Sequence, residues 1–192
     1  MDHSDHVRLI REGVTGGGPN WADLGSGGGA FTLALADLLG PAGRIVSVDR
    51  DPAALRGQAR ELRQRFPTLT VDQRLADFSQ PLDLPRLDGI VMANSLHFVR
   101  DKAPVLALVH GYLRDGGRLV LVEYDADRGN PWVPFPLSFE TWRSAAAEAG
   151  FRDTRRLASV PSRFLGSIYS ALSLRPSVPV PQQRAGSRTP SR

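Results

Sequence analysis

A glycine-rich segment near the start of the sequence carries the first pattern that could bind a cofactor. It reads Asp23-Leu24-Gly25-Ser26-Gly27-Gly28-Gly29 and directly follows a short apolar run. Glycine permits positive φ angles and a close approach to a ligand, and the helix after such a loop presents unpaired N–H groups. The spacing of Gly25, Gly27 and Ala30 also satisfies a dinucleotide-binding pattern, so spacing alone leaves the choice of nucleoside cofactor open.

Two carboxylates bear on which cofactor this loop could hold. Asp23 lies two residues before the first glycine, where it would repel a pyrophosphate. It would favour a cofactor that carries a sulfonium and an ammonium, as S-adenosylmethionine does. Asp49 ends the apolar run 45–48 and could accept both ribose hydroxyls, which nicotinamide dinucleotides and S-adenosylmethionine share. The alternative role for Asp49 is a helix N-cap, although its neighbours Arg50 and Asp51 could serve there as well.

These residues can bind one ligand only if the fold brings them to the same edge of a sheet. The pattern of apolar residues predicts such a sheet. Strands are expected at residues 21–24, 44–48, 69–75, 87–92 and 118–123, helices at 31–39, 51–65, 102–114 and 139–149, and two final strands at about 153–160 and 166–174. Five strand-then-helix units and a hairpin predict an α/β fold: a doubly wound, seven-stranded, mostly parallel sheet with a C-terminal antiparallel hairpin. Ligands of such sheets bind at the carboxyl ends of the strands.

With these motifs in this order, the chain resembles the class I S-adenosylmethionine-dependent methyltransferases, closest to the small-molecule, ubiquinone/menaquinone-type branch. The resemblance covers about residues 20–175. Its matching segments are Asp23–Gly29, Ala76-Asp77-Phe78, Asn94-Ser95-Leu96-His97-Phe98 and Leu113–Leu119. It implies a Rossmann-like methyltransferase fold and S-adenosyl-L-methionine as the cofactor.

The resemblance also implies where the cofactor lies. Asp23 and the glycines would hold its methionine part, Asp49 the ribose and Asp77 the adenine amino group. The expected cofactor-binding residues are Asp23, Gly25, Ser26, Gly27, Gly29, Asp49, Arg50, Asp77, Phe78 and Asn94. Taken alone, Asp77 and Asn94 have local alternatives, because both residue types readily bond their own backbone in loops and at strand ends.

His97 is the candidate catalytic residue on the acceptor side. It follows the fourth predicted strand and could take a proton near neutral pH. The alternative is a histidine packed beside Leu96 and Phe98, because methyl transfer often needs no strong base. The expected walls of the acceptor pocket are the N-terminal helix around His6–Ile10, the loop His97–Arg100 and the aromatic segment Tyr124–Phe139.

The sequence therefore predicts a methyltransferase that acts on a small molecule, at oxygen or carbon. One alternative is an NAD(P)-dependent reductase, but the chain lacks a Tyr-x-x-x-Lys pair for that chemistry. Its one lysine, Lys102, has no tyrosine four residues before it. The other alternative is a non-catalytic module that only binds the cofactor. A nucleic-acid acceptor is not expected, because Asn94 is followed by Ser95-Leu96 and not by the Pro-Pro-[Phe/Tyr] of methyltransferases that modify amino groups.

Composition excludes several other classes. The chain has no cysteine, which rules out disulfides and thiolate metal sites, and its four histidines are scattered, so no metal is expected. No apolar run is long enough for a membrane span. Residues 1–5 are polar and acidic, unlike a secretory signal, and we expect a cytoplasmic protein.

The charge of the chain is concentrated at its end. The four arginines from Arg175 onward account for the whole net charge of +4, so residues 1–174 are balanced. We expect a methyltransferase domain over residues 1–175 and a disordered, basic, Pro-rich tail over residues 176–192. Few residues precede the first strand, where relatives often carry a lid. Completion of the pocket by a second subunit, in a homodimer, is one alternative that the sequence leaves open.

Overall fold

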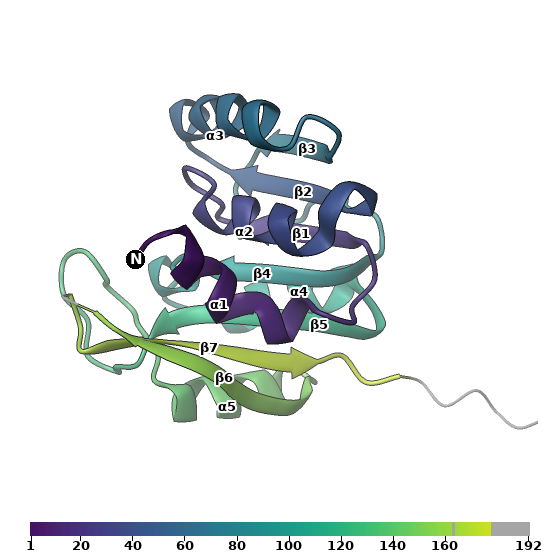
Figure 1. Ribbon diagram of the computed structural model, residues 1–192. Coiled ribbons are helices and arrows are strands. Elements are labelled where there is room, and N and C mark those ends of the chain that lie inside the picture. The colour runs from purple at the N-terminus through teal and green to yellow at the C-terminus, as the bar shows by residue number, and fades with distance from the viewer. Residues whose placement is uncertain (163, 178–192) are drawn as a thin grey trace, which may run out of the picture.

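Seven strands form one sheet in the computed structural model, which describes residues 1–162 and 164–177 (Figure 1). Their order is β3-β2-β1-β4-β5-β7-β6, with β7 antiparallel to both of its neighbours and the other pairs parallel. The strands are β1 Asn20–Leu24, β2 Arg44–Asp49, β3 Thr70–Leu75, β4 Leu87–Ala93, β5 Leu113–Tyr124, β6 Arg152–Pro161 and β7 Ser167–Leu174. The predicted mostly parallel sheet with a C-terminal antiparallel hairpin is confirmed.

Helices cover both faces of this sheet. On one face lie α1 (His3–Val14), α2 (Ala30–Leu39) and α3 (Pro52–Arg65), and on the other lie α4 (Ala103–Tyr112) and α5 (Phe139–Glu148). Figure 1 shows α1 and α2 in front of the strands. Each face has its own apolar layer, in which Trp21 and Trp142 are among the largest fully buried side chains.

Strand β4 lies at the centre of the sheet, and all seven of its residues are buried. A continuous apolar strand is typical of a parallel sheet that is covered on both faces. Gly89 pairs with Trp21 of β1 and lies against its indole, because a Cβ atom at residue 89 would be 2.3 Å from the ring. The close approach of this ring to the β4 backbone therefore requires glycine.

Two predicted details were wrong. No helix follows β3, so the structure has four strand-then-helix units and not five. Residues 76–86 run as a loop that contains Pro81 and Pro85, and proline removes a helical hydrogen bond and clashes with the preceding turn. Strand β5 also starts at Leu113, five residues early. Residues 114–117 form an irregularity in the pairing of β5 with β4. Leu87 pairs with Leu113, but Gly89, two residues later, pairs with Arg118.

Part of the predicted tail, residues 178–192, lies outside the described residues, and its assignment as a separate tail stays a prediction. Across residues 1–162 and 164–177, no helix is both long enough and apolar enough to span a bilayer. The same residues hold no group of three or more side chains suited to a metal ion.

The contact between Trp21 and Gly89 gives a test of the core. Gly89→Ala should destabilise the protein by about 1–3 kcal/mol or more, because the added methyl group meets a rigid buried ring. Gly111→Ala is the matched control. A Cβ at this exposed position in α4 meets nothing within 4 Å, so alanine should be neutral or stabilise the helix by about 0.5–1 kcal/mol. Urea unfolding measures both changes, and equal stabilities for the two variants would contradict this packing.

Candidate functional site

A cleft opens at the carboxyl edge of the sheet, where the loops after β1, β2, β3 and β4 meet. Its main cavity has a volume of about 490 Å³. The lining residues are Gly25, Gly27, Asp49, Arg50, Ala76, Asp77, Phe78, Ser79, Asn94, Ser95, Phe98 and Val99. The structure thus brings together seven of the ten residues expected to bind the cofactor. The other five lining residues, Ala76, Ser79, Ser95, Phe98 and Val99, were not among those ten.

Hydrogen bonds to both neighbouring strands hold the glycine loop. The N–H groups of Gly25 and Ser26 both donate to the Val48 carbonyl of β2, at 2.9 and 3.0 Å. On the β4 side, the Ser95 hydroxyl donates to the Leu24 carbonyl at 2.8 Å. Gly25 has a φ of 80°, and a Cβ there would lie 2.4 Å from the Ser95 Cβ, so this position requires glycine.

Asp49 faces the cleft from the end of β2. Its Oδ2 accepts from the Gly27 N–H at 2.7 Å, and its Oδ1 accepts from the Asp51 N–H at 2.8 Å. Asp51, and not Asp49, caps α3, because its side chain accepts from the N–H groups of Ala53 and Ala54. Each oxygen of an ionised carboxylate has a second acceptor site. Asp49 therefore keeps the capacity to accept ribose hydroxyls while it orients the glycine loop.

The loop after β3 supplies the next wall of the cleft. Asp77 is exposed there, and its Oδ1 accepts from the backbone N–H and the hydroxyl of Ser79 at 2.9 and 2.7 Å. These two bonds lower the pKa of Asp77. The local turn expected as the alternative role is therefore present. It coexists with a place in the cleft lining, beside Phe78 and Arg50.

Asn94 has a buried polar atom without a partner. Its Oδ1 is enclosed and meets no hydrogen-bond donor among the described residues. The residue has a φ of 51° and lines both the main cavity and the neighbouring one. Buried polar groups are rarely left unpaired in folded proteins. The site thus presents an acceptor that a ligand with an N–H group, such as the ammonium of a methionine moiety, would satisfy.

The other three expected residues lie behind the surface of the main cavity. Ser26 lines only the second cavity, and Gly29 begins α2 with a φ of 90°. Asp23 is 1% exposed and lines neither cavity. It accepts a hydrogen bond from the Thr32 hydroxyl at 2.6 Å, and burial together with the like charge of Asp49 raises its pKa to about 7. The structure places Asp23 beneath the glycine loop.

His97 lies one layer behind the cleft wall. Its side chain is buried and lines neither cavity, but its ring packs 4.3 Å from the ring of Phe98, which does. Its Nδ1 pairs with the Glu123 carboxylate at 2.8 Å, and its backbone N–H donates to the same carboxylate at 3.1 Å. Glu123 on β5 is fully buried. Sequence analysis missed it, because Glu123 ends an apolar run and looks like the last residue of a strand.

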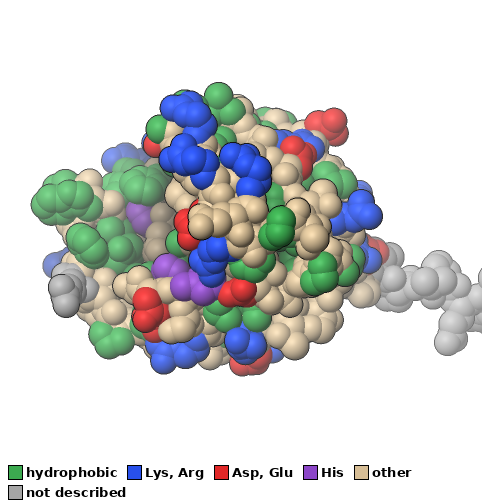
Figure 2. Space-filling view, turned by 45° about the horizontal axis from the view of Figure 1, so that its top comes forward, with side chains coloured by type: hydrophobic (Ala, Val, Ile, Leu, Met, Phe, Trp, Pro, Cys, Tyr) green, Lys and Arg blue, Asp and Glu red, His purple; other side chains and the backbone are tan. Residues whose placement is uncertain are grey.

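The expected acceptor walls are joined to each other. The Phe135 N–H donates to the His97 carbonyl at 3.0 Å. Lys102 donates to the carbonyls of Val99 and Phe135, each at 2.9 Å. Beyond these contacts the wall is exposed and aromatic, with Phe98 56% and Trp132 72% exposed. Figure 2 shows hydrophobic side chains gathered at the left end, toward which β2 and β4 point in Figure 1.

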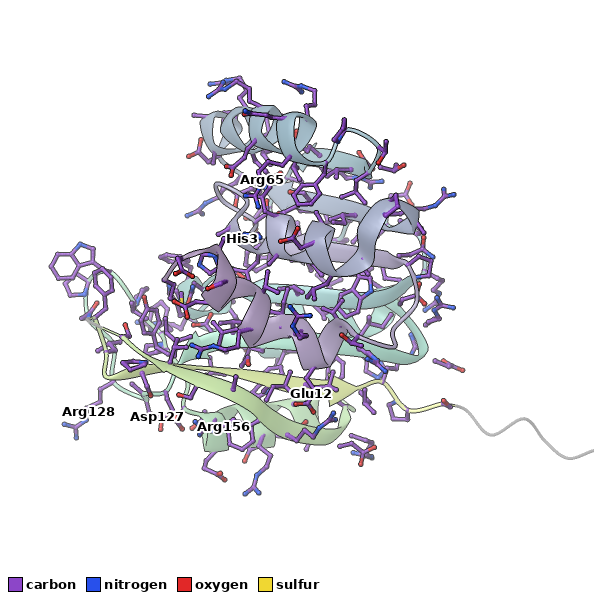
Figure 3. The ribbon with its side chains drawn as sticks, viewed as in Figure 1. His3, Glu12, Arg65, Asp127, Arg128 and Arg156 are labelled. Atoms are coloured by element: carbon purple, nitrogen blue, oxygen red, sulfur yellow. The ribbon has the colours of Figure 1, made fainter. Side chains whose placement is uncertain are left out.

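A second cavity of about 500 Å³ lies on the other side of the glycine loop, against α1 and α3. Its lining includes His3 and His6 of α1 and Arg65 of α3. Of the expected acceptor wall His6–Ile10, His6 alone is in this lining. Figure 3 shows His3 and Arg65 close together across the gap between the helices, where Arg65 Nη2 is 3.2 Å from His3 Nε2. His3 also bonds Asp37 of α2, so the first turn of α1 is tied to both neighbouring helices.

Comparison with known proteins decides the family. Residues 22–119 match the family model of a methyltransferase domain. This chain belongs to that family. Its cofactor is S-adenosylmethionine, and the nicotinamide-dependent reductase considered from the glycine spacing is excluded by the match.

Individual relatives agree with this assignment. The chain is 30% identical over 104 residues to the ubiquinone/menaquinone biosynthesis C-methyltransferase UbiE of Pasteurella multocida, covering 53% of this chain and 38% of that protein. It is 35% identical over 82 residues to the ribosomal RNA small subunit methyltransferase H of Desulfosudis oleivorans, covering 40% and 26%. The chain thus spans about a quarter to two fifths of these relatives.

Solved structures share the fold. YcgJ of Bacillus subtilis superposes with a TM-score of 0.73 at 12% identity, over 92% of this chain and all of that one. The CurJ carbon methyltransferase superposes with a TM-score of 0.67 at 22% identity, over 85% of this chain and 50% of that one. The predicted Rossmann-like methyltransferase fold is confirmed.

The raised pKa of Asp23 predicts how stability depends on pH. The folded state holds the proton of Asp23 up to a pH of about 7, whereas the ordinary value is 3.8. The resulting stabilisation is complete below pH 4 and is lost as the pH rises through 7. Asp23→Asn does not ionise, so relative to wild type it should gain about 2–3 kcal/mol between pH 5 and pH 8.

Urea unfolding at the two pH values measures this gain. Asp83→Asn, in the exposed loop after β3, is the control and should differ from wild type by the same amount at both. A pH-independent effect of Asp23→Asn would contradict the burial of an ionisable group at this position.

Proposed function

We propose that this protein transfers a methyl group from S-adenosylmethionine to a small-molecule acceptor, at oxygen or carbon. The observation that carries the proposal is a row of hydrogen-bond acceptors along one cleft, from Asp77 through Asp49 to Asn94. The adenine amino group, the ribose hydroxyls and the methionine ammonium present donors in that same order. The unpaired Oδ1 of Asn94 supports this arrangement, because it is a buried hydrogen-bond acceptor to which no described residue donates.

Several observations favour a small acceptor over a nucleic acid. The wall beyond the cleft is aromatic, with Phe98 and Trp132 exposed, which suits an apolar or planar molecule. Residues 1–174 carry no excess positive charge, although phosphate binding normally depends on such an excess. Among the similar proteins, UbiE and CurJ are carbon methyltransferases by name, whereas methyltransferase H is named for ribosomal RNA.

In this proposal the protein aligns the acceptor atom with the methyl group of the cofactor and keeps water out of the cleft. When bound, S-adenosylmethionine supplies a methyl group whose bond to sulfur breaks, leaving its electron pair on sulfur, as the bond to the acceptor forms. Asp49 and the loop after β3 orient the adenosine, and the acceptor atom must then lie in line with the methyl group. Phe98 and the aromatic segment that contains Phe135 form the acceptor wall.

His97 acts as a positioning residue in this proposal. Its side chain and its backbone N–H are both held by Glu123, and its carbonyl accepts from Phe135. These bonds fix the short helical turn Leu96–Phe98 and hold Phe98 in place relative to the aromatic segment that contains Phe135. A histidine 3% exposed behind the cleft wall supports this role over direct proton removal from the acceptor.

Turnover with labelled cofactor tests the proposed function. Incubation with methyl-labelled S-adenosylmethionine and a panel of phenols, enolisable ketones and ribosomal RNA should release S-adenosylhomocysteine only with members of the small-molecule set. Turnover with RNA alone would contradict the acceptor class. Binding of the cofactor without turnover on any acceptor would support a non-catalytic module instead.

Three substitutions of His97 separate positioning from proton transfer. Asn places an amide N–H near the position of Nδ1, so His97→Asn should keep the bond to Glu123 and most of the turnover with the best acceptor of the panel. His97→Gln and His97→Ala lose that bond and should raise KM for the acceptor severalfold. A general base would instead make all three variants lose about 10²–10⁴-fold in kcat. Affinity for S-adenosylhomocysteine should stay at the wild-type value throughout.

A further inference from the structure

His6 differs from the other three histidines of the chain. Its ring lines the second cavity and has no hydrogen-bond partner among the residues that the structure describes. His3 lines the same cavity, but its ring is bonded to side chains of both neighbouring helices. His97 is bonded to a buried carboxylate and, like His110, lines neither of the two cavities. The half-buried imidazole of His6 therefore keeps both ring nitrogens available for a ligand.

The cavity that His6 lines adjoins the cleft. Gly25, Gly27 and Asn94 line both cavities, so a ligand at this boundary is open to groups from either side. The ring of His6 packs against that of Phe31, with 4.8 Å between the ring centroids. Phe31 is the second residue of α2, directly after the glycine loop. This contact holds His6 beside the loop and on the side of the cavity that is formed by α1.

The same turn of α1 packs on the apolar layer that the aromatic segment 124–139 also joins. Val7, the residue after His6, belongs to this layer together with Tyr124 and Val133 of the segment. Ala93, which precedes Asn94 and lines the second cavity, belongs to it as well. An acceptor molecule held between the aromatic segment and α1 would therefore have Asn94 and the free ring of His6 beside it.

We propose that His6 is the general base of the reaction and takes the proton of an acceptor that lies beside Asn94, between α1 and the aromatic segment. This inference rests on the proposed function. The hydroxyl or acidic C–H group of the acceptor gives its proton to a ring nitrogen of His6. The acceptor atom then bonds to the methyl group, while the electron pair of the sulfur–methyl bond stays on sulfur. His6 leaves the step as an imidazolium and returns to its neutral form by releasing the proton to solvent.

The surroundings of His6 favour its neutral form, which is the form that can accept a proton. Partial burial lowers its pKa below the ordinary value of 6.5, so the ring is neutral at pH 7. On the strand side, Ala93 and Asn94 carry no charge. The charged and titratable groups around the ring belong to α1 and the residues before it, to α2 and to α3: the Met1 amino group, Asp2, His3, Asp5, Asp37, Glu61 and Arg65.

Two substitutions separate proton removal from packing. His6→Phe keeps a ring against Phe31 and His6→Gln keeps a hydrogen-bonding group, but neither side chain can take a proton. Both should lower kcat with the best small-molecule acceptor by about 10²–10⁴-fold and leave affinity for S-adenosylhomocysteine at the wild-type value. The wild-type rate should fall as the pH drops through a value below 6.5, and this step should be absent from both variants. His110→Gln is the matched control and should keep the wild-type kcat and pH profile.

Proton NMR of the histidine rings tests the placement of His6 on the unmodified protein and without turnover. With S-adenosylhomocysteine bound, addition of the best acceptor should shift the ring signals of His6 and leave those of His110 unchanged. Unmoved signals of His6, or a wild-type kcat in His6→Gln, would overturn the role of His6 and leave the proposed function standing. Absence of wild-type turnover on every small molecule of the panel would overturn both proposals.

Discussion

The glycine loop after β1 is pinned between the ends of β2 and β4, and the cleft depends on this constraint. Val48 accepts two N–H bonds from the loop, Asp49 accepts a third and Ser95 bonds the backbone of Leu24 from the other side. A loop held at these points keeps its remaining surface free for a ligand. Because the parallel strands all end at this edge, Asp77 and Asn94 arrive at the same cleft from separate parts of the chain.

The same constraint explains why charged and polar groups are buried beneath the loop. Asp23 is the last residue but one of β1, in which Trp21, Ala22 and Leu24 belong to the two apolar layers. Its hydrogen-bond partner is Thr32, which in turn accepts from Gln58. His97 and Glu123 form a second buried polar pair, between β4 and β5. Asp23 lies beneath the glycine loop, and the His97–Glu123 pair lies behind Phe98 of the cleft wall. None of the three residues lines either cavity.

Much of the fold and cleft could be predicted, because apolar periodicity marks the strands and strand-end residues must converge in a parallel sheet. What could not be predicted depends on contacts between distant segments. Glu123 ends an apolar run, and only the folded structure shows that it faces His97. The burial of Asp23 is likewise invisible in the glycine motif. The predicted count of five strand-then-helix units was one too high, because residues 76–86 run as a loop with two prolines. The roles of the individual cleft residues stay predictions.

A crystal structure of the protein with S-adenosylhomocysteine tests the central claim most directly. The ribose hydroxyls should bond Asp49, the adenine should lie between Asp77 and Phe78, and the ammonium should approach the Oδ1 of Asn94. Glu123 and His97 should keep their bond, with the thioether sulfur facing the aromatic wall. A nucleoside bound elsewhere, or an Asn94 oxygen still unpaired in the complex, would contradict the account of this cleft.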